Sequence, residues 1–327
     1  MSDELAAFHR CRGLHAPPIR YHVDPGSVKY FADSLMDPDP ASRRPSVPGP
    51  VAGGGLVAPP TFFGGATGLI EIPAGDSRTM FQLVLPIPEG WTAIASGDEF
   101  DFLAPVRAGM TLVCQERFED AYEKQGSTGR LIFFTVVKSF TTDDGATLLR
   151  RKLHCVARPP HPQAAPALGT LPVRQTAPDS QLPAVAVGPV TIRYLAMFAT
   201  ATAEFVDIHY DADHARSLGL PGAIIQGLYK TALAARMVKD WTGDAEALRR
   251  LSVQHRRMDL AGSTLTAGGA IISPMPQSLP ADVSCRIWVH NQHGIVTTQG
   301  TADLTLPANA RTAAWLNRAS TKEHVSA

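Results

Sequence analysis

The sequence contains few cysteines, and none of them lie close together. The four cysteines form no Cys-x-x-Cys pair: Cys11, Cys114, Cys155 and Cys285. This spacing argues against a zinc knuckle and is typical of reduced thiols in a cytosolic protein. The chain also lacks an apolar run of the ~20 residues that a membrane helix needs. Its N-terminus carries acidic residues and no apolar core segment, so we expect no secretory signal. We therefore predict a cytoplasmic protein with no membrane partner.

An excess of charge of either sign is also missing. Thirty basic residues balance thirty acidic ones, so the formal net charge is zero. A neutral chain has no global field that would attract nucleic acid, and we expect no such partner. With 44% hydrophobic and 18% charged residues, the composition is that of a globular protein. A length of 327 residues is enough for two domains.

One segment near the middle lacks apolar periodicity. Residues 158–189 are rich in proline and alanine, which is typical of a linker. This predicts an N-terminal domain over residues 1–157 and a C-terminal domain over residues 190–327.

The two halves share sequence features in the same order. Tyr30–Asp37 (YFADSLMD) resembles Met197–Glu204 (MFATATAE), and Ala108–Leu112 (AGMTL) resembles Ala261–Leu265 (AGSTL). Two matches across a central linker indicate a duplicated domain. We expect two similar halves related by an approximate two-fold axis. Their sheets should pair edge to edge, because this pairing removes an exposed strand edge.

The hydrophobic pattern predicts one helix and several strands in each half. In the second half, Ala223–Trp241 has helical spacing and Gly243 follows as a stop signal. Four predicted strands come after this helix: Arg250–Arg256, Ser263–Ile272, Ala281–His290 and Ile295–Leu306. In the first half, a shorter, glycine-interrupted helix is expected over Pro60–Ile72, with strands over Arg130–Phe140 and Thr147–Ala157. This order predicts an α+β fold in which an antiparallel sheet wraps one helix, twice over.

Segments of both halves resemble a known family. In the second half these are Glu204–Asp211 (EFVDIHYD), Ala215–Gly222 (ARSLGLPG) and Gln226–Leu228 (QGL). Together they resemble the signature of MaoC-like hydratases and dehydratases. Asp37–Pro40, Val57–Phe62 and Phe102–Gly109 resemble the N-terminal domain of two-domain members. The resemblance runs from about Tyr21 to Pro307, and it implies two fused hot-dog domains with the active site in the second.

The resemblance also implies roles for individual residues. His209 takes the place of the catalytic histidine, and Glu204 stands where the family has aspartate. The backbone N–H of Gly227 stands where the start of the central helix points at the thioester oxygen. Asp207 offers a second carboxylate, so the catalytic pair is Glu204 with His209, Asp207 with His209, or broken; we favour the first. Val206, which replaces the family's asparagine, is expected to line the substrate site together with Tyr210 and Gln226.

Some of these residues also have a purely structural interpretation. Gly227 is explained equally well by close packing of a helix on a sheet. Asp211 is expected to cap a short helix rather than to act in catalysis. Asp37 and Asp39 occupy the matching loop of the first half, but no histidine follows at the required offset. We therefore expect the first half to be non-catalytic.

The function implied by the resemblance is an (R)-specific enoyl-thioester hydratase, or a 3-hydroxyacyl-thioester dehydratase. The substrate would be an acyl thioester of coenzyme A or of an acyl carrier protein, with neither metal nor cofactor, and a homodimer is possible. Two alternatives remain open. One is a changed reaction on the same scaffold, such as cyclisation or isomerisation, and the other is a non-catalytic subunit that binds acyl thioesters.

Overall fold

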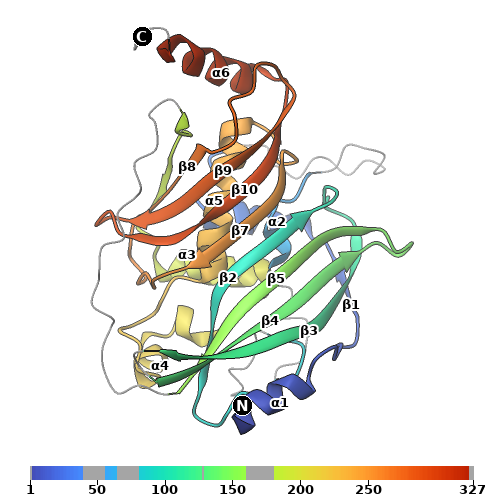
Figure 1. Ribbon diagram of the computed structural model, residues 1–327, viewed down its shortest axis with the longest axis vertical. Coiled ribbons are helices and arrows are strands. Elements are labelled where there is room, and N and C mark those ends of the chain that lie inside the picture. The colour runs from blue at the N-terminus through green and yellow to red at the C-terminus, as the bar shows by residue number, and fades with distance from the viewer. Residues whose placement is uncertain (1, 40–55, 65–80, 127–128, 160–179, 324–327) are drawn as a thin grey trace.

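The fold is known from a computed structural model, which describes residues 2–39, 56–64, 81–126, 129–159 and 180–323. In the described part of the chain, one twisted antiparallel sheet of ten strands runs along the molecule, and helices α2, α3 and α5 lie behind it in Figure 1. The strand order is β1-β3-β4-β5-β2-β7-β10-β9-β8-β6. Within the described residues, no helix is long and apolar enough to cross a membrane.

The strand order is the same when it is followed from either end of the sheet. The first half contains β1 (Ile19–His22), β2 (Thr92–Phe102), β3 (Thr111–Gly126), β4 (Gly129–Thr141) and β5 (Thr147–Arg158). Their counterparts in the second half, in the same sequence order, are β6 (Val185–Val187), β7 (Leu248–His255), β8 (Leu265–Ile271), β9 (Ala281–Asn291) and β10 (Val296–Leu306). The predicted duplication is therefore visible in the topology.

The two halves join where β2 pairs with β7. The pairing runs antiparallel from Gly97 opposite Gln254 to Asp101 opposite Arg250. Each half thereby covers a strand edge of the other. The predicted edge-to-edge pairing is confirmed.

The remaining elements are helices of varied length. They comprise α1 (Asp3–Arg10), α2 (Pro25–Ser34), η2 (Phe62–Gly64), α3 (Ile192–Thr202), η4 (Asp207–His209), α4 (Ala212–Ser217), α5 (Gly227–Thr242) and α6 (Ala310–Glu323). Helices α2 and α3 carry the first sequence repeat. Their equivalent residues Phe31 and Phe198 pack together, with ring centroids 5.3 Å apart.

Helix α5 is the central helix of the second half. Nearly all of its side chains are buried, and it contacts β2 as well as β7 to β10. It begins four residues later than predicted, because Ile224 forms a β-bridge with Leu260 and holds the preceding segment extended. It ends as predicted at Gly243, which adopts a left-handed conformation that costs glycine little.

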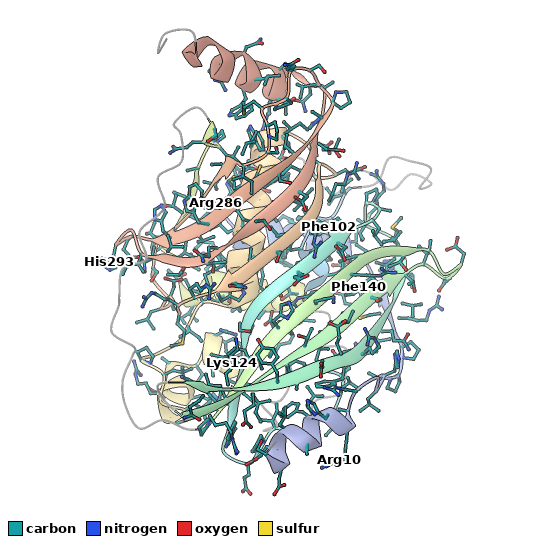
Figure 2. The ribbon with its side chains drawn as sticks, in the orientation of Figure 1. Arg10, Phe102, Lys124, Phe140, Arg286 and His293 are labelled. Atoms are coloured by element: carbon teal, nitrogen blue, oxygen red, sulfur yellow. The ribbon has the colours of Figure 1, made fainter. Side chains whose placement is uncertain are left out.

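The strands of both halves alternate between a buried and a half-exposed face. Figure 2 labels Phe140 on β4, which is buried, and Arg286 on β9, which is half-exposed. Strand bounds differ from the predicted ones by at most two residues.

Two sequence predictions concern residues that are only partly described. Of the predicted first-half helix, Phe62–Gly64 forms a single 3-10 turn, and residues 65–72 lie outside the described residues. Most of the predicted linker, residues 160–179, also lies outside them, and Val185–Val187 at its end forms β6. The domain boundaries stay a prediction.

Candidate active site

His209 is held in one tautomer by the backbone. It ends the 3-10 turn η4, is 7% exposed, and its Nδ1 lies 2.8 Å from the carbonyl oxygen of Ile224. A carbonyl oxygen only accepts hydrogen bonds, so Nδ1 carries the proton and Nε2 carries a lone pair. Burial lowers the pKa of His209 to about 4, although the Ile224 hydrogen bond opposes this shift. At neutral pH the ring is uncharged, and Nε2 is the ring nitrogen that can accept a proton.

Glu204 has the opposite electrostatic character. It follows α3, beyond Ala203, which ends the helix in a left-handed conformation. The side chain is 8% exposed, and its Oε2 has no hydrogen-bond partner among the described residues. Burial raises the pKa of Glu204, while the positive charge of Arg151 partly opposes the shift. A raised pKa favours the protonated form of this carboxyl group over that of an exposed glutamate.

The start of α5 presents backbone N–H groups that the helix itself does not bond. The N-cap residue Gln226 makes no side-chain hydrogen bond to the helix. The first N–H groups of a helix have no partner within the helix, so the first turn can bind an oxygen that carries negative charge. Gly227 is the first residue of this helix. His209 contacts the chain at Ile224, three residues earlier.

Gly227 is also required for packing. A Cβ atom at this position would lie 2.8 Å from the ring of His255 on β7. The structural interpretation of this glycine is therefore supported, and it does not conflict with a role for its N–H group.

The side chain of Gln226 is fully buried. Its Nε2 donates to the carbonyl oxygen of Leu195 on α3, 3.2 Å away. Its Oε1 has no partner in the part of the chain that the structure describes. Gln226 therefore joins α3 to the start of α5 and keeps one acceptor available.

Three other predicted site residues make local contacts. Val206 is buried in a small apolar cluster with Ile208 and Ile224. Asp207 is exposed and accepts a hydrogen bond of 2.8 Å from the Tyr210 hydroxyl. Burial, followed by this hydrogen bond, raises the pKa of Tyr210 to about 12. The carboxylate of Asp207 is thus engaged at the surface, whereas that of Glu204 is buried.

The other acidic residues have structural roles. Asp211 accepts hydrogen bonds from the backbone N–H groups of Asp213 and His214, so its predicted role as a helix cap is confirmed. In the first half, Asp37 is buried and pairs with Lys239 of α5, and Asp39 lies 3.4 Å from the same ammonium group. These contacts fix the loop of the first half against the central helix of the second.

The sequence prediction missed a buried polar network beside Gly227. The carboxylate of Asp98 on β2 accepts hydrogen bonds from Arg151 on β5, Thr231 on α5 and His255 on β7. Burial opposes ionisation of Asp98, but the Arg151 charge and the His255 hydrogen bond hold its pKa well below the usual range. The only signal in the sequence is that Asp98 and Arg151 occupy inward positions of otherwise apolar alternating strands.

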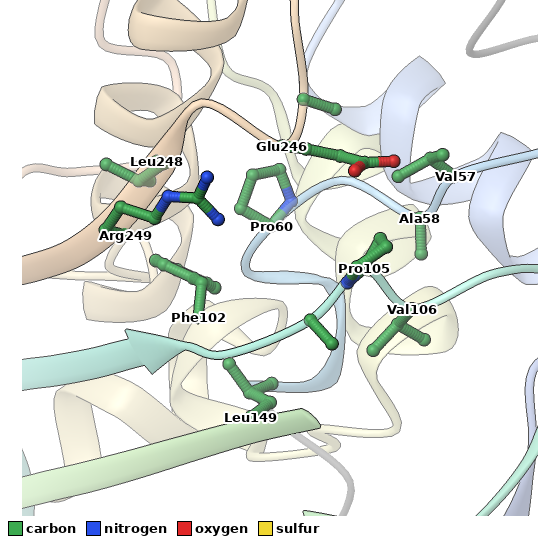
Figure 3. Close-up of a pocket in the computed structure, with 12 residues that line it drawn as sticks. Val57, Ala58, Pro60, Phe102, Pro105, Val106, Leu149, Glu246, Leu248 and Arg249 are labelled. Carbon is green, nitrogen blue, oxygen red and sulfur yellow. The ribbon is translucent and has the colours of Figure 1, made fainter. Parts of the chain in front are cut away.

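A small pocket lies at the opposite end of α5 (Figure 3). Its lining includes Pro60, Phe102, Val106, Leu149, Leu248 and Arg249, where β2 ends and β7 begins. None of the predicted site residues lines this pocket. Within the described residues, no group of three or more His, Cys, Asp or Glu side chains could hold a metal ion.

Comparisons with known proteins agree with this architecture. Residues 10–151 match the family model of the FAS1-like dehydratase domain region, and residues 174–271 match that of the MaoC like domain. No curated protein matches the chain.

Several solved structures share the fold. A MaoC-like dehydratase aligns with a TM-score of 0.70 and 19% identity, over 93% of this chain and 100% of the other. A MaoC-like dehydratase from Phytophthora capsici aligns with a TM-score of 0.61 and 14% identity, over 90% of this chain and 96% of the other. A conserved hypothetical protein from Mycobacterium tuberculosis, which has a double hotdog fold, aligns with a TM-score of 0.61 and 13% identity. The alignment covers 92% of this chain and 99% of the other. The predicted α+β double hot-dog fold is confirmed.

Proposed function

Because the chain belongs to the MaoC-like dehydratase family, we propose that it adds water to an enoyl thioester, or removes water from a 3-hydroxyacyl thioester. The proposed substrate is an acyl thioester of coenzyme A or of an acyl carrier protein, and the proposed product of hydration has the (R) configuration. The observation that carries the proposal is the contrast between two buried groups. His209 is neutral with Nε2 unprotonated, and Glu204 is a carboxyl group with a raised pKa.

The proposed reaction assigns one proton transfer to each group. In hydration, Nε2 of His209 removes a proton from water, and the oxygen of that water bonds to C3 of the enoyl thioester. The electron pair of the double bond moves toward the thioester carbonyl, and C2 takes a proton from Glu204. The proton on His209 then returns to Glu204 through solvent. No atom is gained or lost except the added water.

The remaining requirement is a donor for the thioester oxygen, which gains negative charge as the enolate forms. We assign this role to the N–H group of Gly227 at the uncapped start of α5. The helix dipole adds to the stabilisation, because its positive end lies at the same place.

The test is turnover of crotonyl-CoA and of a longer trans-2-enoyl-CoA by the full chain. Dehydration of (R)- and (S)-3-hydroxybutyryl-CoA is measured in parallel. We expect hydration of at least one enoyl thioester and reaction of the (R) isomer alone. Reaction of the (S) isomer would contradict the stereochemistry. Absence of any hydration would favour a repurposed scaffold or a binding subunit.

A further inference from the structure

The seam between the two halves carries a buried carboxylate that touches both. Asp98 lies on β2, the strand of the first half that pairs with β7, and its side chain is fully buried. Its Oδ2 accepts a hydrogen bond of 2.8 Å from the Thr231 hydroxyl and lies 3.3 Å from Nε2 of His255. Both partners belong to the second half. Asp98 is therefore a point at which the first half contacts the central helix near its start, whereas Asp37 contacts it at Lys239 near its end.

Both contacts converge on the first turn of α5. Thr231 follows Gly227 by one turn, and its hydroxyl oxygen lies 3.3 Å from the Gly227 carbonyl oxygen. The His255 ring packs so closely that a Cβ atom on Gly227 would come within 2.8 Å of it. The helix start is thus held by a hydrogen bond on Thr231 and by the ring of His255.

The other side of the network fixes Asp98 itself. Arg151 on β5 donates from Nε to Oδ1 over 2.8 Å, which leaves Oδ2 for Thr231 and His255. A carboxylate accepts only, so Nε2 of His255 carries the proton, and its Nδ1 accepts from the Thr298 hydroxyl at 3.2 Å. A continuous series of hydrogen bonds therefore runs from Arg151 through Asp98 and His255 to Thr298.

We propose that Asp98 is a positioning residue: acting through Thr231 and His255, it places the Gly227 N–H group for the thioester oxygen. The inference rests on the proposed function for the role of that N–H group. The first half carries no catalytic side chain in the proposed reaction. Through Asp98 it would nevertheless contribute to the reaction rate. Misplacing a reacting group by about 1 Å can cost ~10²-fold in rate.

The test compares two isosteric substitutions on one helix. Thr231→Val removes the hydroxyl that contacts Asp98, whereas the separate variant Thr231→Ser keeps it. Thr242→Val is the matched control, because Thr242 is equally buried at the far end of α5 and its hydroxyl, within the described residues, bonds only to backbone groups of Val238, Lys239 and Asp244. The position of the N–H group is measured by NMR on protein labelled with 13C at the glutamine carbonyl and 15N at glycine. With this labelling, only glycines that directly follow a glutamine give a signal, and the sequence has three of them: Gly126, Gly227 and Gly300.

We expect Thr231→Val to move the Gly227 amide resonance while those of Gly126 and Gly300 stay in place. Its kcat on an enoyl thioester should fall about 10-fold, less than the ~10²–10³ from loss of an oxyanion donor, with KM within about twofold. Thr231→Ser and Thr242→Val should resemble the wild type in both measurements. An unmoved Gly227 resonance, or equal movement in Thr242→Val, would overturn the inference. If the wild type hydrates nothing, the proposed function fails, but the resonance still tests the positioning.

Discussion

Nδ1 of His209 donates a hydrogen bond of 2.8 Å to the carbonyl oxygen of Ile224. This bond leaves the lone pair on Nε2, the atom that acts as the base in the proposed reaction, and burial lowers the pKa of His209 to about 4. A base must be unprotonated to act, so kcat/KM for hydration should fall on the acid side with a midpoint near pH 4. We would measure kcat/KM from pH 3.5 to 8 and check the fold by circular dichroism at each pH. A midpoint near 6.5, the ordinary value for histidine, would contradict the buried environment of His209.

The same shift predicts how stability depends on pH. The unfolded chain binds a proton at His209 below pH 6.5, while the folded chain does so only below about pH 4. The stability that the neutral ring contributes is present above pH 6.5 and is lost as the pH falls from 6.5 to 4. In His209→Asn, which can still donate to Ile224, this loss is absent. Between pH 7 and 4, the free energy of unfolding of the wild type should therefore fall by about 3 kcal/mol relative to the variant. If the free energy of unfolding, measured by urea denaturation, changes with pH equally in the wild type and the variant, the lowered pKa of His209 is disproved.

The two candidate carboxylates differ in burial, and this decides which one we expect to matter. Glu204 is buried and its Oε2 has no hydrogen-bond partner in the described part of the chain, whereas Asp207 is exposed and bonded to Tyr210. Glu204→Gln should lower turnover by at least ~10²-fold, and Asp207→Asn should have little effect. The proposed reaction needs Glu204 in its protonated form, so it predicts that wild-type activity also declines as the pH rises through the raised pKa of Glu204. If instead Asp207 is essential and Glu204 dispensable, the acid role moves to Asp207.

The contact between Gly227 and His255 can be tested through stability. Gly227→Ala places a methyl group 2.8 Å from the His255 ring, and such overpacking should cost about 1–3 kcal/mol of unfolding free energy. His255→Ala removes the obstacle, so the double variant should be more stable than the sum of the two single effects predicts. Thermal and urea unfolding of the four proteins gives the coupling energy. Strict additivity would show that the two residues do not touch.

The sequence predicted the parts of the fold that depend on local pattern. The pattern of Arg130–Phe140 predicted strand β4, and the helical spacing of Ala223–Trp241 predicted helix α5. The observed bounds of both elements lie within a few residues of the predicted ones. The repeat around Phe31 and Phe198 gave the duplication, because equivalent residues meet where the two halves pack. The start of α5 was misplaced because Ile224 forms a bridge with a residue 36 positions away along the sequence, Leu260, and such a contact leaves no local signal.

The candidate site was predictable only where the family signature carries it. His209, Glu204 and Gly227 were found through that signature, and their roles stay predictions. The Asp98 network was missed because it depends on the register between β2 and β7, which brings together residues more than 150 positions apart along the sequence. A charge at an inward strand position, as at Arg151, marks a buried ion pair but does not identify its partner.

The most direct test of the account is the turnover of an enoyl-CoA by His209→Ala, compared with His154→Ala. His154 is a suitable control because its ring also makes side-chain hydrogen bonds, to Thr135 and Glu99, but on the half-exposed face of the sheet, opposite to the face that buries Asp98 and Arg151. Both variants should remain folded. The account predicts that His209→Ala loses at least ~10²-fold in kcat while His154→Ala stays within about threefold of the wild type. Equal turnover by His209→Ala and the wild type would contradict the assignment of His209 as the base.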